Sequence, residues 1–163
     1  MLAQLADILR YSLDSDRKPM VPLSEELHFV ETYLEIEKAR FGRRLQVKMD
    51  IDESARPLLV PPMILQPLVE NAVKHGLAPK EEGGEITLQI KHVNGNLAIE
   101  VNDNGVGVGA TGDQKQDWLQ SGTGLHNTDQ RLRKMFGESS GLQVRNGATG
   151  FQVKFQIPVV IHS

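Results

Sequence analysis

The segment PPMILQPLVENAVKHGL, residues 61–77, constrains the fold of this chain more than any other stretch. At about 100° per residue, a helix through it has one apolar side and one polar side. The apolar side holds Leu65, Leu68, Val69, Ala72, Val73 and Gly76, and the polar side holds Glu70, Asn71, Lys74 and His75. Pro67 lacks an N–H, so it either kinks this helix or marks its start. The apolar side must be buried against a core, whereas the polar side is either a solvated surface with an ion pair between Glu70 and Lys74 or one wall of a site.

Two helices are expected upstream of this segment. The first covers residues 2–13, whose leucines form a stripe at helical spacing without an N-cap, which suggests that the chain is a piece of a longer protein. The second follows Ser24 as its N-cap, carries Glu25 and Glu26 in its first turn and closes at Gly42. We expect the two helices to form a hairpin, which either covers the core of the downstream domain or makes a dimer contact.

Alternating apolar and polar residues predict five strands. The strands cover residues 45–51, 85–93, 97–102, 142–145 and 151–157. Asn94-Gly95-Asn96 predicts the turn of one hairpin, and Asn146-Gly147 predicts the turn of another. A further amphipathic helix is expected over residues 124–136, ending at Gly137. This order of elements predicts an α+β fold, a two-layer α/β sandwich whose mainly antiparallel sheet is covered by helices on one face.

Composition excludes several classes of function. The chain contains no cysteine, which rules out disulfides, thiolate zinc sites and cysteine nucleophiles, and fits a reducing compartment. Its formal net charge is -3, so no global basic field recruits nucleic acid. No apolar run approaches the roughly 20 residues that a membrane-spanning helix needs. These properties indicate an ordinary globular domain without a nucleic-acid partner.

The segment Asp103-Asn104-Gly105-Val106-Gly107 directly follows an expected strand. A buried carboxylate at a strand end could accept a hydrogen bond from an exocyclic amine such as that of adenine. The glycines would let the backbone approach a flat ligand closely. Ordinary turn chemistry explains the same residues, so this segment alone does not specify a site.

The segment SGTGL, residues 121–125, opens the helix expected over residues 124–136. Unpaired N–H groups and the helix dipole attract phosphate at such a position. A flexible hinge accounts for the glycines equally well. The segment is neither a Walker A sequence nor a GxGxxG motif after a strand, so those two nucleotide-binding folds can be set aside.

In combination, these segments resemble the GHKL superfamily, whose ATP-binding domain has the Bergerat fold. ENAVKHG, DNGVG and GTGL are similar to its N, G1 and G2 boxes and occur in the same order. The sequences PPMILQPLVENAVKHGL, GTGLHNTDQRL and LADILRYSL, with the helix through Tyr33, further resemble the LytS/YehU type of bacterial sensor histidine kinase. The resemblance implies a Bergerat ATP-binding catalytic domain with a mixed sheet over residues 44–163. It also implies that residues 1–43 are a remnant of the dimerisation and phosphoacceptor region.

The same resemblance implies ATP and Mg²⁺ as cofactors and assigns roles to individual residues. Asn71 resembles the asparagine whose side-chain oxygen holds Mg²⁺, Glu70 the acidic neighbour that acts as base or orients the acceptor, and Lys74 a phosphate contact. Asp103 resembles the aspartate that binds adenine. The other nucleotide-binding residues that it implies are Asn71, Lys74, His75, Gly105, Gly107, Gly122, Thr123, Gly124, Leu125 and Thr149. Residues 110–120 would form the lid over ATP.

Kinases of this type phosphorylate a histidine in an Asn-Pro-His-Phe sequence, which does not occur here. The chain has five histidines, none of which is expected to be the acceptor: His75 is expected to support the nucleotide site, and the others to be structural or surface residues. They are His28, His75, His92, His126 and His162. We therefore expect the acceptor histidine to lie in an upstream segment and this chain not to phosphorylate itself.

The resemblance implies that the chain is the cytoplasmic catalytic domain of a two-component sensor histidine kinase. The intact protein would be a homodimer anchored in the bacterial inner membrane. It would transfer the γ-phosphoryl group of ATP to its own upstream helix, and from there signal to a cytoplasmic response regulator. Two alternatives remain open: a non-catalytic nucleotide-sensing module that regulates a helical interface, and an ATPase domain of the chaperone or topoisomerase type.

Overall fold

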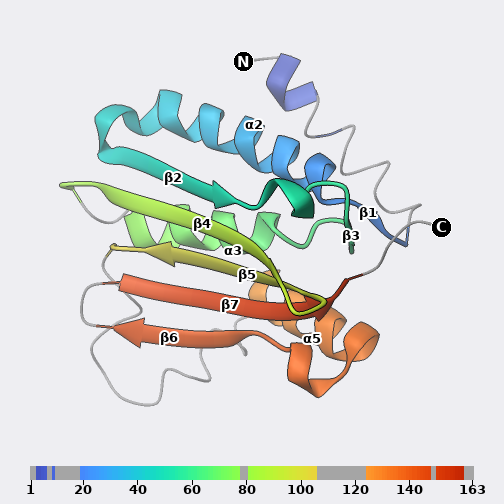
Figure 1. The fold of residues 1–163 in the computed structure, drawn as a ribbon. Coiled ribbons are helices and arrows are strands. Elements are labelled where there is room, and N and C mark those ends of the chain that lie inside the picture. The colour runs from blue at the N-terminus through green and yellow to red at the C-terminus, as the bar shows by residue number, and fades with distance from the viewer. Residues whose placement is uncertain are drawn as a thin grey trace.

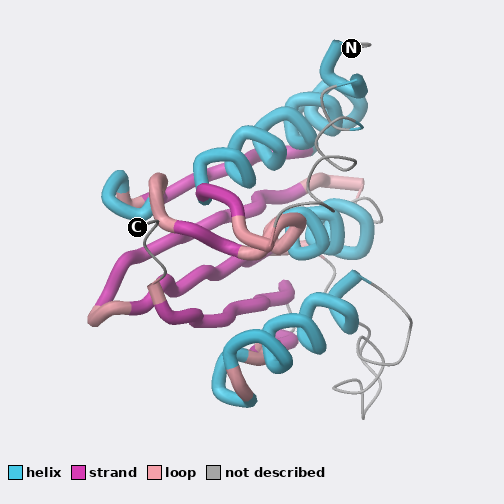
Figure 2. The backbone as a smooth tube through the Cα atoms, turned by 90° about the vertical axis from the view of Figure 1, so that its right-hand side faces the viewer, coloured by secondary structure: helices cyan, strands magenta, loops and turns pink. Residues whose placement is uncertain are grey.

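The computed structural model describes residues 3–6, 9, 19–77, 81–105, 124–147 and 150–159. A five-stranded sheet lies on one side, and helices lie along one of its faces (Figures 1 and 2). The helices that cover this face are α2 (Leu23–Phe41), α3 (Gln66–Asn71) and α5 (Gly124–Phe136). The two-layer α+β sandwich expected from the sequence is confirmed.

The sheet has the strand order β2-β4-β5-β7-β6. Its strands are β2 (Leu45–Ile51), β4 (Gly84–Val93), β5 (Asn96–Asp103), β6 (Gln143–Gly147) and β7 (Gly150–Pro158). The pair β2 and β4 is parallel, and the other three pairs are antiparallel. The sheet is therefore mixed and mainly antiparallel, as expected.

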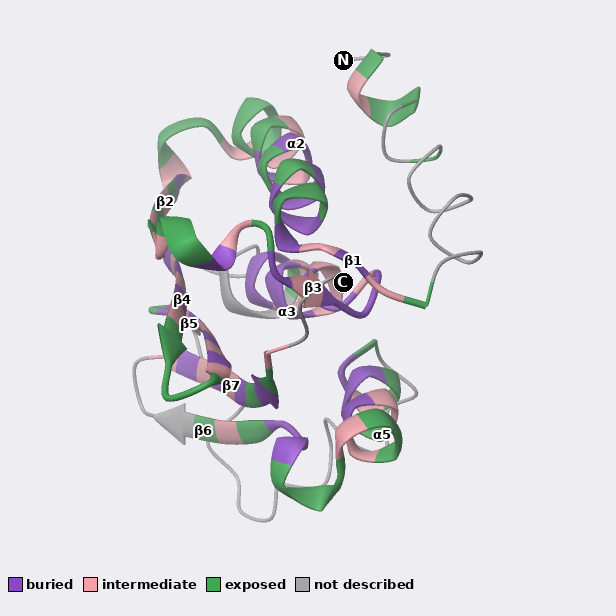
Figure 3. Cartoon of the chain, turned by 45° about the vertical axis from the view of Figure 1, so that its right-hand side comes forward, coloured by how far each residue is buried: buried purple, intermediate pink, exposed green. Residues whose placement is uncertain are grey.

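Side chains on β4, β5 and β7 alternate between the core and the uncovered face, as the period of two in a strand requires. Most of those that face the helices are apolar and at most 3% exposed. They are Ile86, Leu88, Ile90, Leu97, Ile99, Val101, Val153, Phe155 and Ile157. Figure 3 shows this buried layer between the sheet and the helices.

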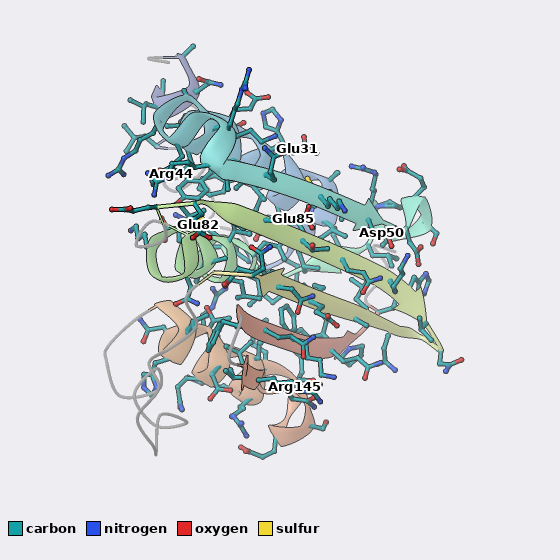
Figure 4. All side chains as sticks on the ribbon, turned by 90° about the vertical axis from the view of Figure 1, so that its left-hand side faces the viewer. Glu31, Arg44, Asp50, Glu82, Glu85 and Arg145 are labelled. Carbon is teal, nitrogen blue, oxygen red and sulfur yellow. The ribbon has the colours of Figure 1, made fainter. Side chains whose placement is uncertain are left out.

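The other face of the sheet is polar and is not covered by a helix (Figure 4). Charged residues pair across neighbouring strands there: Lys91 lies 2.9 Å from Asp50, and Lys48 lies 3.6 Å from Glu85. Because these side chains are at least partly exposed to solvent, which screens their charges, each pair adds little to stability. The stability of the sheet therefore comes mainly from its buried face.

Helix α2 begins without the N-cap that we expected from Ser24. Its N-cap residue is Pro22, and no side chain caps the helix. The N–H groups of Leu23 and Ser24 instead donate to the carbonyls of Leu58 (2.8 Å) and Arg56 (2.9 Å). The prediction for Ser24 was wrong because a strand pair, β1 (Val21–Pro22) with β3 (Leu59–Val60), brings backbone acceptors to this helix end.

The other end of α2 matches the sequence analysis, since Gly42 closes it with a φ of 61°. Leu27, Val30 and Leu34 of α2 are buried in the same core as the sheet. Helix α2 therefore covers the core, whereas a dimer contact made by the hairpin stays a prediction. Residues 3–6 of the first expected helix are helical, and Gln4 Nε2 donates to Glu35 Oε2 of α2 at 2.7 Å.

The hairpin between β4 and β5 turns where the sequence predicted. Asn94 and Gly95 have φ values of 52° and 75°, the left-handed conformation that such a turn needs. The second turn was predicted too early, because Asn146 and Gly147 still pair with β7, opposite Phe151 and Gly150. The connection therefore falls at residues 148–149, which lie outside the described residues.

Helix α5 ends before Gly137, which has a φ of 102°, as the sequence predicted. In the part of the chain that is described, no helix is both long and apolar enough to cross a membrane.

Candidate functional site

The central helix begins at Gln66, so Pro67 marks its start rather than a kink. It continues as a π-helical turn, η3 (Ala72–Leu77). The described residues of its apolar side, from Leu65 to Val73, are buried, as expected, and its polar side lies at the edge of the core. Glu70 and Asn71 are half-buried and Lys74 is exposed. The structure therefore brings all three expected catalytic residues to one accessible side of α3 and η3. The side chain of His75, which was also expected at the site, is not among those that the structure describes.

Glu70 is held by a neighbour on its own helix. Gln66 Nε2 donates to Glu70 Oε1 at 3.2 Å. Among the described residues, no ion pair joins Glu70 to Lys74, so that interpretation of the polar side is not supported. The π-helical turn between these residues widens the spacing of hydrogen bonds from i, i+4 to i, i+5, a feature frequent at functional sites.

Tyr33 of α2 is a residue near the site that the sequence analysis did not assign a role. Burial is the largest cause that raises its pKa, and the charges of Glu37 and Glu70 raise it further. Its hydroxyl is buried and has no hydrogen-bond partner among the described residues. Tyr33 therefore stays protonated at neutral pH and lies close enough to Glu70 to respond to its charge.

Asp103 ends β5 on the helix-covered face of the sheet and is 7% exposed. Its Oδ1 accepts a hydrogen bond from the N–H of the buried Gly105 at 3.0 Å. Asn104 fastens the same segment to β4, because its Oδ1 accepts from the N–H of Glu85 at 2.6 Å and its own N–H donates to the carbonyl of Glu85. A buried carboxylate is thus fixed at the strand end, where it fits an amine donor of a ligand.

Gly150, at the start of β7, lies against the backbone of Asp103 on the neighbouring strand β5. A Cβ placed on Gly150 would lie 2.1 Å from the backbone oxygen of Asp103 and 3.1 Å from its carbonyl carbon. Only a residue without a side chain fits there. The sequence analysis missed this contact, because nothing local in the sequence shows which strand lies beside Asp103.

The Gly150→Ala variant is therefore expected to be less stable by about 1–3 kcal/mol, the usual cost of overpacking. It is also expected to bind nucleotide more weakly, because the new methyl group pushes the backbone of Asp103 out of place. Urea unfolding and calorimetric titration with ATP measure the two effects. Gly95→Ala is the control for strain alone, since its Cβ would meet no atom within 4 Å although φ is 75°.

Gly124 begins α5 beside the start of α3. A Cβ on Gly124 would lie 2.9 Å from Cβ of Pro67, so a glycine is needed for the two helices to approach this closely. The next residue, Leu125, is 1% exposed and belongs to the core. The side chain of Leu125 therefore packs in the core. Any contact of Leu125 with a nucleotide would have to come from its backbone.

Four expected site residues lie outside the described residues: Gly107, Gly122, Thr123 and Thr149. The expected lid, residues 110–120, lies there too. Within the described ranges, no group of three or more acidic, histidine or cysteine side chains forms a metal site. The available donors are one asparagine oxygen, an exposed ammonium and a buried carboxylate, from Asn71, Lys74 and Asp103. This set fits a nucleotide that brings Mg²⁺ with it, since Mg²⁺ needs few protein ligands when phosphates supply the others.

Two family models match the chain. Residues 62–161 match the histidine kinase-, DNA gyrase B- and HSP90-like ATPase family, and residues 1–45 match a histidine kinase family. The sensor protein LytS of Staphylococcus saprophyticus is 36% identical over 167 residues, and that of Oceanobacillus iheyensis is 33% identical over 166 residues. Each alignment covers 97% of this chain but 28% of the relative. The chain thus spans about a quarter of these curated relatives.

Solved structures of histidine kinases share the fold. The Acinetobacter baumannii histidine kinase AdeS has a TM-score of 0.66 at 14% identity, covering 96% of this chain and 76% of that one. The kinase domain of the blue-light activated histidine kinase from Erythrobacter litoralis has a TM-score of 0.62 at 22% identity, covering 85% and 62%. Histidine kinase ThkA, solved in complex with the response regulator TrrA, has a TM-score of 0.64 at 15% identity, covering 98% and 48%.

Proposed function

The chain belongs to the family of histidine kinase-, DNA gyrase B- and HSP90-like ATPases, and on this premise we propose that it is the ATP-binding catalytic part of a sensor histidine kinase. The observation that carries the proposal is the buried carboxylate of Asp103, fixed at the end of β5 in a domain whose central helix exposes Glu70, Asn71 and Lys74. The matches to LytS proteins support the kinase among the members of this family.

Each of the described side chains has a distinct task in this proposal. Asp103 accepts the exocyclic amine of adenine, and Asn71 offers a hard oxygen to Mg²⁺. Lys74 neutralises phosphate charge, and Glu70 orients the acceptor histidine or takes its proton. Bound ATP with Mg²⁺ would supply the γ-phosphoryl group and part of the charge neutralisation. The protein's part is then to hold these groups in line for transfer.

The partners that we propose for the whole protein rest on its resemblance to sensor histidine kinases. We propose an upstream acceptor helix, a homodimer, an anchor in the bacterial inner membrane and a cytoplasmic response regulator. The complex of ThkA with TrrA supports the last of these, since ThkA has the same fold. In this arrangement the described chain would face the cytoplasm.

Phosphoryl transfer to an acceptor helix supplied in trans tests the proposal. The chain is mixed with a helix that carries an Asn-Pro-His-Phe sequence and with ATP labelled in its γ-phosphate, and acid-labile label on the helix is measured. We expect Glu70→Gln to slow transfer by about 100-fold or more, a usual effect of removing a general base, with ATP affinity unchanged. Glu31→Gln, an exposed change on α2, is the control.

The outcomes separate the alternatives. ATP binding without transfer to the acceptor would favour a nucleotide-sensing module that acts on a helical interface. Sustained ATP hydrolysis without any acceptor would favour an ATPase of the chaperone or topoisomerase type. Stable phosphohistidine on this chain alone would contradict the expectation that the acceptor lies elsewhere.

A further inference from the structure

A buried carboxylate that the proposed chemistry does not use lies between α2 and α3. Glu26, in the first turn of α2, is 1% exposed. It accepts hydrogen bonds from three consecutive backbone N–H groups, those of Met63 (3.1 Å), Ile64 (2.7 Å) and Leu65 (3.3 Å). These residues directly precede α3, so the carboxylate binds the chain at the point where the central helix begins.

The segment that Glu26 holds has an unusual backbone. Met63 has a φ of 60°, a left-handed conformation that residues other than glycine seldom adopt. Such a conformation persists where surrounding contacts impose it. Here the three N–H groups converge on one carboxylate, which imposes the turn and fixes the direction in which α3 leaves it.

Helix α5 also contacts this segment. Arg131 Nη2 donates to the carbonyl of Pro62 at 2.7 Å. Burial raises the pKa of Glu26, whereas the three N–H groups and the charge of Arg131 act to lower it. Residues 61–65 are thus a junction of three helices: α2 through Glu26, α5 through Arg131, and α3, which the segment starts.

The junction is coupled to the site over a short distance along the chain. Asn71 lies six residues after Leu65, which at about 1.5 Å per residue is less than two helical turns. A helix this short transmits a shift at its start to its end with little bending. Helices α2 and α3 also run in the same direction, because Glu26 meets residues before α3 whereas Tyr33 lies near Glu70.

We propose that Glu26 and Arg131 are positioning residues for the nucleotide site, which set the place of Asn71 and Glu70 by fixing the start of α3. This inference rests on the proposed function, because it concerns how the same site is assembled. Through Glu26, a movement of α2 would shift the start of α3 and with it Asn71, the proposed Mg²⁺ ligand. A purely structural role would instead change only the stability of the domain.

The test is the gain in ATP affinity that Mg²⁺ produces, measured by calorimetric titration of this chain with and without Mg²⁺. We expect Glu26→Gln and Arg131→Met each to reduce this gain by about tenfold or more, as changes to residues that orient metal ligands do. The affinity for ATP without Mg²⁺ should stay within a factor of about two in both variants. A loss of stability alone would leave the ratio of the two affinities unchanged in the folded protein.

Matched controls are Glu25→Gln and Arg145→Met, which remove the same charges from exposed positions and should leave the gain intact. If Glu26→Gln does not fold, Arg131→Met decides: a reduced gain supports the inference, and an unaltered gain overturns it. An unaltered gain in both folded variants overturns it as well. Absence of ATP binding by the unmodified chain would overturn the proposed function itself, which keeps the two failures apart.

Discussion

The Asp103→Asn variant is expected to bind ATP about a hundredfold or more weakly than the unmodified chain, the largest effect on binding of any single change proposed for this site. The amide oxygen would keep the hydrogen bond to the N–H of Gly105, so the strand end should retain its shape. Its NH₂ group would then face the amine of adenine, donor against donor. Each buried donor left unpaired costs about 1–3 kcal/mol, which together account for a loss of this size.

Calorimetric titration with ATP measures this change, with circular dichroism to confirm the fold. The control is Asn102→Ala on the same strand, because Asn102 points to the uncovered face and donates to Glu100 rather than to the site. Its affinity for ATP should match that of the unmodified chain. Equal ATP affinities for Asp103→Asn and the unmodified chain would mean that Asp103 does not contact adenine.

Removing the side-chain oxygen of Asn71 is expected to abolish the dependence of ATP binding on Mg²⁺. Asn71→Ala is expected to leave α3 intact, because alanine is a good helix former and the side chain of Asn71 is half-buried rather than part of the core. Transfer to an acceptor helix should fall by about a hundredfold or more, since phosphoryl transfer relies on positioning and charge neutralisation.

Binding of ATP in the absence of Mg²⁺ is the internal control, and it should be the same with and without the substitution. Titrations with ATP at several Mg²⁺ concentrations separate the affinity for ATP alone from the gain in affinity that Mg²⁺ adds. If Asn71→Ala keeps the full gain in affinity from Mg²⁺, the metal is held by other groups and the assignment of Asn71 is wrong.

The parts of the fold that the sequence predicted are those set by local chemistry. The alternation in β4, β5 and β7 is determined by which face of a strand is buried, and the turn at Asn94 and Gly95 by the left-handed conformation that both adopt. The polar side of the central helix followed from its spacing alone. The family resemblance then supplied what spacing does not, namely which ligand the polar side would meet.

The contacts that the sequence did not predict join residues far apart along the chain. Glu26 was explained by the dipole of its own helix, although its partners lie 37 to 39 residues away. The cap expected from Ser24 was displaced by carbonyls more than 30 residues downstream. Gly150 was given no role, since the expected strand began at residue 151, and its approach to Asp103 depends on β7 pairing with β5. Such pairings leave no trace in local periodicity, so tertiary contacts override the local signal.

The strand order bears on when the domain can fold during its synthesis. The last strand in the sequence, β7, is not at an edge but lies between β5 and β6. Until it leaves the ribosome, β5 presents a bare edge and β6 has no neighbour, and such edges invite pairing with other chains. The sheet is therefore completed late in synthesis, and we expect the nascent chain to be prone to aggregation until residues 150–158 emerge. A message truncated just before them would encode a product with most of the core residues but without the strand that covers the edge of β5.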